Sequence, residues 1–314
     1  MANVLLDEDV DSYLAAYFEY LLRYRGLSEA TVKTYAQDLN TFVDFLTTMR
    51  IHKVDSVDRR IVRGFLAFLV DKAYRRSSIS RKLSVLRGFY RWLVSEELSL
   101  VDPVPRRSVM KKETRLPRFL SSEEVSRLID SPKSGGSSEL LVNRDVALLE
   151  LIYAAGLRVS EVHSIGIKDL DIEAKSLRII GKGDKERISL IGTAAALALE
   201  KYINIDRAKF KNTEQINAIF LSNRGSRLSI RSIQNIVKKH SRWAGLGNEV
   251  HTHTLRHSFA THLINGGADL RIVQDLLGHS SPATTQIYTH VTGVESRKSY
   301  LDAHPLAQES REAI

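Results

Sequence analysis

The chain has 314 residues, of which 43% are hydrophobic and 26% are charged, and its formal net charge is +9. This length allows two domains with separate cores, and the composition is that of a water-soluble globular protein. The absence of cysteine excludes disulfides and thiolate zinc sites and fits a reducing cytoplasm. No apolar run is long enough for a membrane span, and the acidic N-terminus is unlike a signal peptide. We therefore expect a cytoplasmic protein that does not contact a membrane.

Residues 11–97 predict helices only, because their apolar side chains recur at helical spacing. The predicted helices begin near residues 11, 28, 56 and 78. Gly26 ends the first of them, and Ser56 or Asp58 caps the third. We therefore expect a helical N-terminal domain over residues 1–102.

Positive charge gathers in the third and fourth predicted helices. Residues 59–91 contain ten Lys/Arg and one acid, so this stretch alone carries a net charge of +9. On the fourth helix the basic residues are expected opposite the apolar stripe, which favours a surface that binds nucleic acid over a merely solvated helix face. The residues that we expect to contact DNA are Arg75, Arg76, Arg81, Lys82, Arg87, Arg106 and Arg107.

A linker is predicted where prolines and basic residues replace the helical pattern. Residues 101–121 hold three of the six prolines of the chain together with a run of basic side chains. Neither a helix nor a strand is compatible with that composition. We assign 103–117 to an extended basic linker that follows a DNA backbone, and 118–314 to a second domain with a C-terminal tail.

The second domain is predicted to combine helices with a small sheet. Its predicted elements are a capped helix start at 121–124, a loop at 134–138, a helix at about 142–155, strands at 177–180 and 186–190, and helices from about 193 onward. The sequence GKGDK between the two strands has the glycines of a tight hairpin. The predicted fold class is therefore mainly α with a small β-sheet in the second domain.

Six polar side chains of the second domain form a candidate site for a phosphodiester. They are Arg158, Lys182, His253, Arg256, His279 and Tyr288, in the strings AAGLRVSE, IGKGDKER, HTHTLRHSFATHL, LLGHS and TTQIYTHV. A guanidinium group presents a planar fork of donors that fits two phosphate oxygens, and it stays charged at every working pH. Arg158 and Arg256 are therefore suited to stabilise the charge that develops in a transition state at phosphorus.

Tyr288 is the candidate nucleophile. A phenol with an ordinary pKa of ~10 needs help to lose its proton, which the arginines provide through their charge and which His253 or His279 provides as a base. Lys182, at the tip of the hairpin, is suited to protonate the departing 5′ oxygen. Because phenolate is a good leaving group, the bond energy is retained and the strand can be resealed. We expect no metal, ATP or other cofactor.

Each of these residues has a plainer interpretation when it is taken alone. The four histidines in 251–262 could indicate a metal site, but no cysteine or well-spaced carboxylate accompanies them. A tyrosine at helical spacing usually belongs to the core. The ordered set of six overturns that interpretation for Tyr288. The plain interpretation is kept for Tyr153, Tyr202 and Tyr300, and His257 and His262 are expected to pack between helices or to line the substrate site.

The five strings, together with LSEATVKTYAQDL near the N-terminus, resemble the tyrosine recombinases, in particular the Xer type. The resemblance runs from about Tyr13 to Thr292, and order, spacing and flanking residues agree. It implies that the six residues form the active site. Thr252 stands where the family usually has proline, and His251 adds a second imidazole, but only His253 has the His-x-x-Arg spacing.

The same resemblance implies the assembly and the reaction. We expect a C-shaped clamp in which a SAM-like helical domain and a catalytic domain enclose double-stranded DNA. Four protomers, either identical or paired with a paralogous recombinase, would exchange strands, with a DNA translocase as a possible activator. The implied activity is site-specific recombination through a 3′-phosphotyrosyl link, which resolves chromosome or plasmid dimers at a dif-like site during chromosome partition and cell division. The alternatives are a phage or mobile-element integrase, a relaxing enzyme of the type IB topoisomerase kind, and a DNA-binding protein with a vestigial site.

Overall fold

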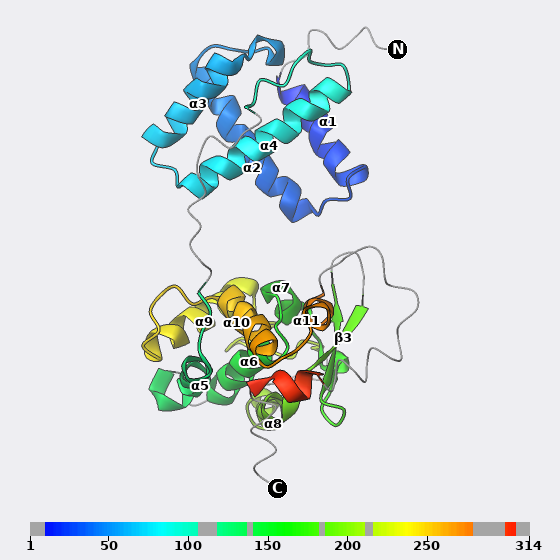
Figure 1. Cartoon of the computed structure of the whole chain (residues 1–314), viewed down its shortest axis with the longest axis vertical. Helices are drawn as coiled ribbons and strands as arrows, with labels where there is room; N and C mark the ends of the chain where they lie inside the picture. The colour runs from blue at the N-terminus through cyan, green and yellow to red at the C-terminus, as the bar shows by residue number, and fades with distance from the viewer. Residues whose placement is uncertain are drawn as a thin grey trace. The chain divides into compact units, whose positions relative to one another are not determined.

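The computed structural model describes residues 10–105, 118–136, 141–181, 186–210, 216–278 and 299–305. The chain divides into two compact units, Met1–Arg115 and Leu116–Ile314 (Figure 1). The predicted linker, 103–117, lies largely outside the described residues, so the domain boundaries stay predictions. Within the described residues, no helix has the length and apolar character that crossing a membrane requires.

The described part of the first unit is helical throughout, as predicted. It contains α1 (Val10–Arg23), α2 (Glu29–Thr48), the short turn η1 (Val54–Ser56), α3 (Arg59–Asp71) and α4 (Arg76–Ser95). Aromatic side chains join the helices, with the ring of Tyr17 on α1 lying 5.3 Å from the rings of both Phe89 and Trp92 on α4. On the other side of the core, the rings of Phe42 and Phe65 pack edge to face at 5.0 Å.

The helix ends follow the caps that the sequence carries. Ser28 precedes α2, and its hydroxyl accepts from the backbone N–H of Thr31. Asp58 precedes α3, and its carboxylate accepts from the N–H groups of Arg60 and Ile61 at 2.8 and 2.9 Å. These bonds satisfy N–H groups that lack partners at the start of a helix. Of the two caps predicted for the third helix, Asp58 is therefore confirmed.

The second unit combines helices with the predicted sheet. Its described helices are α5 (Ser122–Asp130), α6 (Val142–Ala154), α7 (Val159–Ser164), α8 (Gly192–Lys201), α9 (Ile230–Trp243), α10 (Thr252–Asn265) and α11 (Leu270–Leu277), with short turns η2 (Pro132–Gly136), η4 (Ile167–Asp169), η5 (Tyr202–Asp206) and η6 (Arg207–Lys209). The sheet has the order β1 (Leu170–Asp171), β2 (Ser176–Ile180), β3 (Glu186–Leu190), and all pairs are antiparallel. The two predicted strands are confirmed and pair with each other, whereas residues 182–185 of the predicted turn lie outside the described residues. β1 was not predicted, because two residues show no alternation of polar and apolar side chains.

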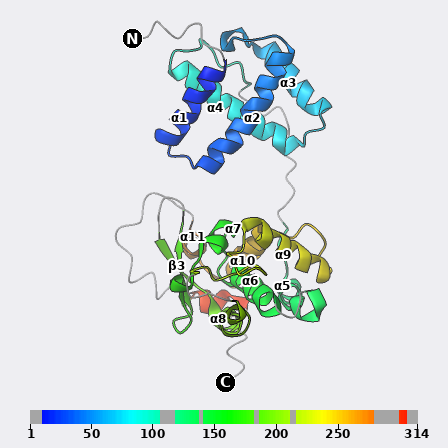
Figure 2. The same cartoon turned by 180° about the vertical axis from the view of Figure 1, so that it is seen from behind.

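The core of this unit is built around α6, which lies between α8 and α10 (Figures 1 and 2). Every residue of α6 from Ala147 onward is buried. A helix that is buried on all sides shows no apolar stripe and belongs to the centre of a domain. The end of α6 is therefore held firmly, and it delivers the chain to the candidate site.

A buried polar chain fixes α9 to this core. His240 on α9 is completely buried, with its Nδ1 3.0 Å from the hydroxyl of Ser131 and its Nε2 3.0 Å from the carboxylate of Asp145 on α6. Asp145 also accepts from the guanidinium of Arg144. Because buried polar groups must be paired, this network selects one packing of α9 against α5 and α6.

Candidate active site

A sharp break after α6 positions Arg158. Gly156 has φ of 56°, and a Cβ at this position would collide with the Phe259 ring of α10. Only glycine suits both the backbone conformation and this close approach. The chain turns there, and Arg158 directly precedes α7, where its backbone N–H donates to Glu161 at 2.8 Å. The helix predicted at about 142–155 is confirmed and ends at this turn.

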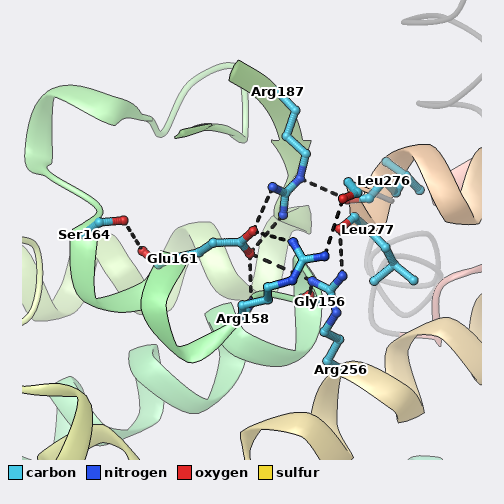
Figure 3. Close-up of polar contacts among 9 residues, drawn as sticks. Gly156, Arg158, Glu161, Ser164, Arg187, Arg256, Leu276 and Leu277 are labelled. Atoms are coloured by element: carbon cyan, nitrogen blue, oxygen red, sulfur yellow. Dashed lines mark hydrogen bonds and ion pairs between the residues drawn. The ribbon is translucent and has the colours of Figure 1, made fainter. Parts of the chain in front are cut away.

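The carboxylate of Glu161 gathers three arginines (Figure 3). Arg158 Nη1 donates to Oε1 at 2.9 Å. Arg187 donates from Nη1 to Oε1 at 2.9 Å and from Nη2 to Oε2 at 3.0 Å. Arg256 Nη1 lies 3.9 Å from Oε2. One buried negative charge thus faces three guanidinium groups, and the cluster keeps an excess of positive charge.

The same three arginines hold the end of α11. Its last carbonyls belong to Leu276, Leu277 and Gly278, and each accepts from a different guanidinium. Arg187 Nε reaches the first at 3.3 Å, Arg256 Nη2 the second at 2.7 Å, and Arg158 Nη2 the third at 3.4 Å. Carbonyls at a helix C-terminus lack intrahelical partners and carry the negative end of the helix dipole. The arginines therefore fix the point from which the chain continues to His279.

Burial and charge shift the pKa values of this cluster. For Glu161, burial raises the pKa, but hydrogen bonds from Arg187 and Arg158 outweigh it, so the net shift is downward and the group is ionised at neutral pH. For Arg256, burial and the neighbouring charge of Arg158 lower the pKa to about 10. Arg256 therefore remains protonated at neutral pH.

His253 lies on α10 one turn before Arg256, and it is exposed whereas Arg256 is buried. Residues at this spacing lie side by side on a helix, so an accessible imidazole stands next to the buried cation. The remaining members of the predicted site, Lys182, His279 and Tyr288, lie outside the described residues. The structure places the flanks of two of them, at the ends of β2 and β3 and at Gly278.

The plain interpretations of the other tyrosines and of His262 hold. Tyr153, Tyr202 and Tyr300 are fully buried in the core. Burial lowers the pKa of His262, whose Nδ1 lies 2.8 Å from the Tyr153 hydroxyl. His257 is half-buried on α10. In the described ranges, no group of three or more His, Asp or Glu side chains is arranged to hold a metal.

The basic residues that were expected to contact DNA from the first unit differ in their exposure and in their contacts. Arg75 and Arg76 are exposed at the start of α4. Arg87 is half-buried and donates to the Pro105 carbonyl. Arg81 is 48% exposed and pairs with Asp38. Arg106 and Arg107 lie outside the described residues.

The expectation that Lys82 lies on an exposed basic face is wrong. Its side chain is only 6% exposed, and its Nζ donates to the Asp38 carboxylate at 3.1 Å and to the Thr41 hydroxyl at 2.7 Å. Both partners lie on α2, so Lys82 points toward the helix that packs on α4. A lysine is buried only when its charge is paired, and the sequence pattern of α4 alone does not reveal its partner.

Sequence reasoning missed Glu161, Arg187 and a basic face on α9. Glu161 follows Arg158 at helical spacing in RVSE, which is the only local signal that it carries. On α9, the residues that alternate with the buried stripe are exposed or half-buried and mostly basic or amide-bearing, namely Arg231, Gln234, Asn235, Lys238, Lys239 and Arg242. Such a face is typical of a second surface for a polyanion.

Paired guanidinium groups beside an accessible imidazole suit an enzyme that acts on a phosphodiester, and comparisons with known proteins show that the class is the enzymes that transfer DNA strands. Residues 118–294 match the phage integrase family, and residues 14–97 match the SAM-like N-terminal domain of phage integrases. The chain therefore belongs to the phage integrase family and is a tyrosine recombinase. The resemblance found in the sequence strings is confirmed.

Individual relatives match over nearly the whole chain. The tyrosine recombinase XerD of Bifidobacterium longum (strain NCC 2705) is 39% identical over 289 residues, covering 90% of this chain and 94% of the relative. The tyrosine recombinase XerC of Halalkalibacterium halodurans is 41% identical over 301 residues, covering 95% and 98%. Among solved structures, the XerH site-specific recombinase bound to difH substrate, a pre-cleavage complex, aligns with a TM-score of 0.65 at 26% identity, covering 85% of this chain and 79% of that one.

Proposed function

We propose that this tyrosine recombinase resolves dimers of a circular chromosome or plasmid by site-specific recombination at a dif-like sequence. The observation that carries this proposal is the pairing of Arg158 and Arg256 around one carboxylate, in a chain that matches Xer recombinases along most of its length. The site favours a phosphate, because its fixed positive charge exceeds its negative charge. A chromosomal substrate would place the enzyme in the cytoplasm.

The six residues take separate roles in one transesterification. Arg158 and Arg256 hold the non-bridging oxygens of the scissile phosphate. The Tyr288 hydroxyl attacks phosphorus, and its proton passes to His253 or His279. The bond from phosphorus to the 5′ oxygen breaks as the bond to the tyrosine forms, and Lys182 gives that oxygen a proton. The products are a 3′-phosphotyrosyl link and a free 5′ hydroxyl, whose attack on the link in another duplex completes the exchange.

Double-stranded DNA is the proposed partner, and four protomers on two duplexes are the proposed assembly. The exposed basic residues of α4 and α9 support DNA binding in both units. The related XerH recombinase supports it further, since its crystal structure holds that protein bound to difH substrate. Strand exchange requires two cleaved duplexes, so we expect either four identical protomers or a pairing with a paralogue.

A covalent-trapping experiment tests the catalytic assignment. Genomic DNA recovered with the protein is sequenced to find its site, and a nicked duplex of that site is incubated with the wild-type protein and with Tyr288→Phe. Nicking lets the 5′-hydroxyl fragment diffuse away, so the wild-type protein should accumulate as a protein–DNA adduct. Tyr288→Phe should bind the duplex but form no adduct. An adduct with Tyr288→Phe would show that another residue is the nucleophile.

The same duplex separates the rival activities. Recombinant products from two duplexes carrying the site indicate a recombinase. Relaxation of a supercoiled plasmid at single sites, without exchange between partners, would instead indicate a topoisomerase-like enzyme. Exchange with an unrelated attachment sequence, in preference to two copies of one site, would indicate an integrase of a mobile element.

A further inference from the structure

Arg187 connects the sheet to the arginine cluster, although it is not one of the six residues of the predicted site. It lies on β3, and its two terminal nitrogens bind both oxygens of Glu161 (Figure 3). Its Nε donates to the Leu276 carbonyl at the end of α11. The side chain is 14% exposed. Arg187 therefore directs its fork toward protein groups, in the two-bond geometry that makes guanidinium–carboxylate pairs strong.

The end of α11 packs closely against the side chain of Arg187. Gly278 has φ of 66°, and a Cβ there would come within 3.1–3.2 Å of the Nη1, Cδ and Cζ atoms of Arg187. The guanidinium thus lies directly against the backbone of Gly278. A side chain held by a carboxylate, a carbonyl and this close backbone contact has little freedom to turn toward a substrate.

Arg187 binds both oxygens of Glu161, whereas the other two arginines make fewer or longer contacts with that carboxylate. Arg158 contributes one side-chain bond to it and remains 37% exposed. Arg256 Nη1 stays at 3.9 Å and donates instead to the Gly156 carbonyl at 2.7 Å. A buried carboxylate without a close cation is strongly destabilised. Without Arg187, Arg158 would be the one guanidinium of the three left in hydrogen-bond contact with Glu161, so the carboxylate would bind Arg158 more tightly or attract Arg256 from its place beside Gly156.

We propose that Arg187 is a positioning residue. It shares the charge of Glu161, so that Arg158 and Arg256 keep their present protein contacts and offer the remaining N–H groups, of the five on each guanidinium, to the scissile phosphate. This role rests on the proposed function of the two arginines. It assigns Arg187 no contact with DNA. The proposed role also explains why a site for an anion contains a buried acid. The carboxylate of Glu161 orders the arginines, and the charge of Arg187 keeps Glu161 from binding Arg158 and Arg256 so tightly that they no longer face the phosphate.

A double-mutant cycle between Arg187 and Glu161 tests the proposal. Arg187→Gln leaves Arg158 as the one guanidinium of the cluster in hydrogen-bond contact with the carboxylate, so Arg158 and Arg256 should shift and the single-turnover rate of adduct formation on the nicked duplex should fall roughly 10- to 100-fold, as for other residues that orient a site. Adding Glu161→Gln removes the charge that captures the arginines, while the Gln amide can still accept the Arg158 backbone N–H, as in a capping box. The double variant should therefore react much faster than Arg187→Gln and about as fast as Glu161→Gln alone.

The outcomes separate the possible roles of Arg187. If Arg187 touched the phosphate, or served only to hold the fold, removing Glu161 would not restore the rate, and the proposal would be overturned. Arg178→Gln on β2 is the matched control, because Arg178 also pairs with acids, Asp169 and Glu186, but lies outside the cluster. It should react like the wild-type protein. Thermal unfolding of each variant, followed by circular dichroism, reports the folded fraction.

If Arg187→Gln does not fold, Arg187→Lys replaces it with and without Glu161→Gln. An ammonium keeps the charge but cannot bridge both oxygens, so its loss of rate should be smaller and should again be restored by Glu161→Gln. Absence of restoration would overturn the proposal in this background too. The wild-type protein distinguishes failure of the proposed function from failure of the role of Arg187. If the wild-type protein formed no adduct, both the proposed function and this role would be overturned. If the wild-type protein formed the adduct but Glu161→Gln did not restore the rate of the Arg187 variant, only the role of Arg187 would be overturned.

Discussion

A buried carboxylate lies among basic side chains in each unit of the molecule, but these two carboxylates, Asp38 and Glu161, meet different numbers of cations. In the first unit, Asp38 pairs with Lys82, which is buried, and with Arg81, which is half-exposed. In the second unit, Glu161 pairs with three arginines that also hold the end of α11. The first carboxylate therefore joins two helices, whereas the second orders a cluster that keeps a surplus of charge.

The difference shows that the number of basic residues in a stretch does not measure its capacity to bind an anion. Lys82 contributes to the +9 of residues 59–91, yet its charge is taken up inside the protein. In the second unit, three guanidinium groups surround one acid, so a net positive charge remains. This charge is partly desolvated, and it therefore attracts an anion more strongly than the same charge in water. Position and pairing, rather than composition, distinguish a structural cation from one that serves a substrate.

The largest effect is expected from Arg158→Ala. Removing one fixed donor from a developing negative charge usually costs a factor of about 10²–10³ in rate, and Arg158 is the most exposed of the three arginines. The rate of adduct formation at saturating DNA should fall by that factor, while the unfolding temperature changes little. Arg178→Ala, on the neighbouring strand, serves as the control. A fall of less than about threefold for Arg158→Ala would place the phosphate elsewhere.

A smaller effect, on stability alone, is expected from Asp38→Asn. Lys82 would remain buried without a counter-charge, so the free energy of unfolding of the protein should fall by about 3 kcal/mol. Asp44→Asn, an exposed position on the same helix, should change it by less than about 0.5 kcal/mol. Adding Lys82→Met to Asp38→Asn should recover much of the loss, because the buried charge is then gone. Urea titration measures all three variants.

Most of the fold could be predicted because its signals are local. Helix stripes, the caps at Ser28 and Asp58 and the two paired strands depend on residues close together in the chain. The exposed face assigned to Lys82 failed for the opposite reason. Its partner Asp38 lies on another helix, and only packing brings the two together.

The sequence was sufficient to predict the side chains that suit a phosphate. It was not sufficient to predict the residues that hold those side chains in place. Arg158, His253 and Arg256 stand in the strings that the sequence singled out, and the structure brings the two arginines to one carboxylate. The contribution of Arg187 depends on β3 approaching α7 and α11, which no spacing in the chain encodes. The chemistry of the site can thus be predicted from the types of its side chains, whereas the contacts that position those side chains are known only from the tertiary structure.

Acid should affect the Glu161 cluster through a single carboxyl group. Its pKa in the folded protein is lowered below the ordinary value of 4.5, so its ionised form adds stability that is present above pH 4.5 and is lost as the pH falls through the lower, folded value. Glu161→Gln should therefore lose less stability than the wild-type protein between pH 5 and pH 3. Urea midpoints across that range measure the difference. Equal slopes would show that the arginines do not favour the ionised carboxylate.

The smallest effect concerns the salt dependence of DNA binding, and it compares exposed arginines at the start of α4 with the buried Lys82. Each phosphate contact contributes about 0.9 to the slope of log affinity against log salt concentration. Arg75→Ala and Arg76→Ala, both at exposed positions, should each reduce the slope by roughly that amount if they meet the backbone. Lys82→Met should leave the slope unchanged, because its ammonium is already bound to Asp38 and Thr41. Fluorescence anisotropy at several salt concentrations measures the slopes, and a reduced slope for Lys82→Met would mean that this lysine leaves its internal partners when DNA binds.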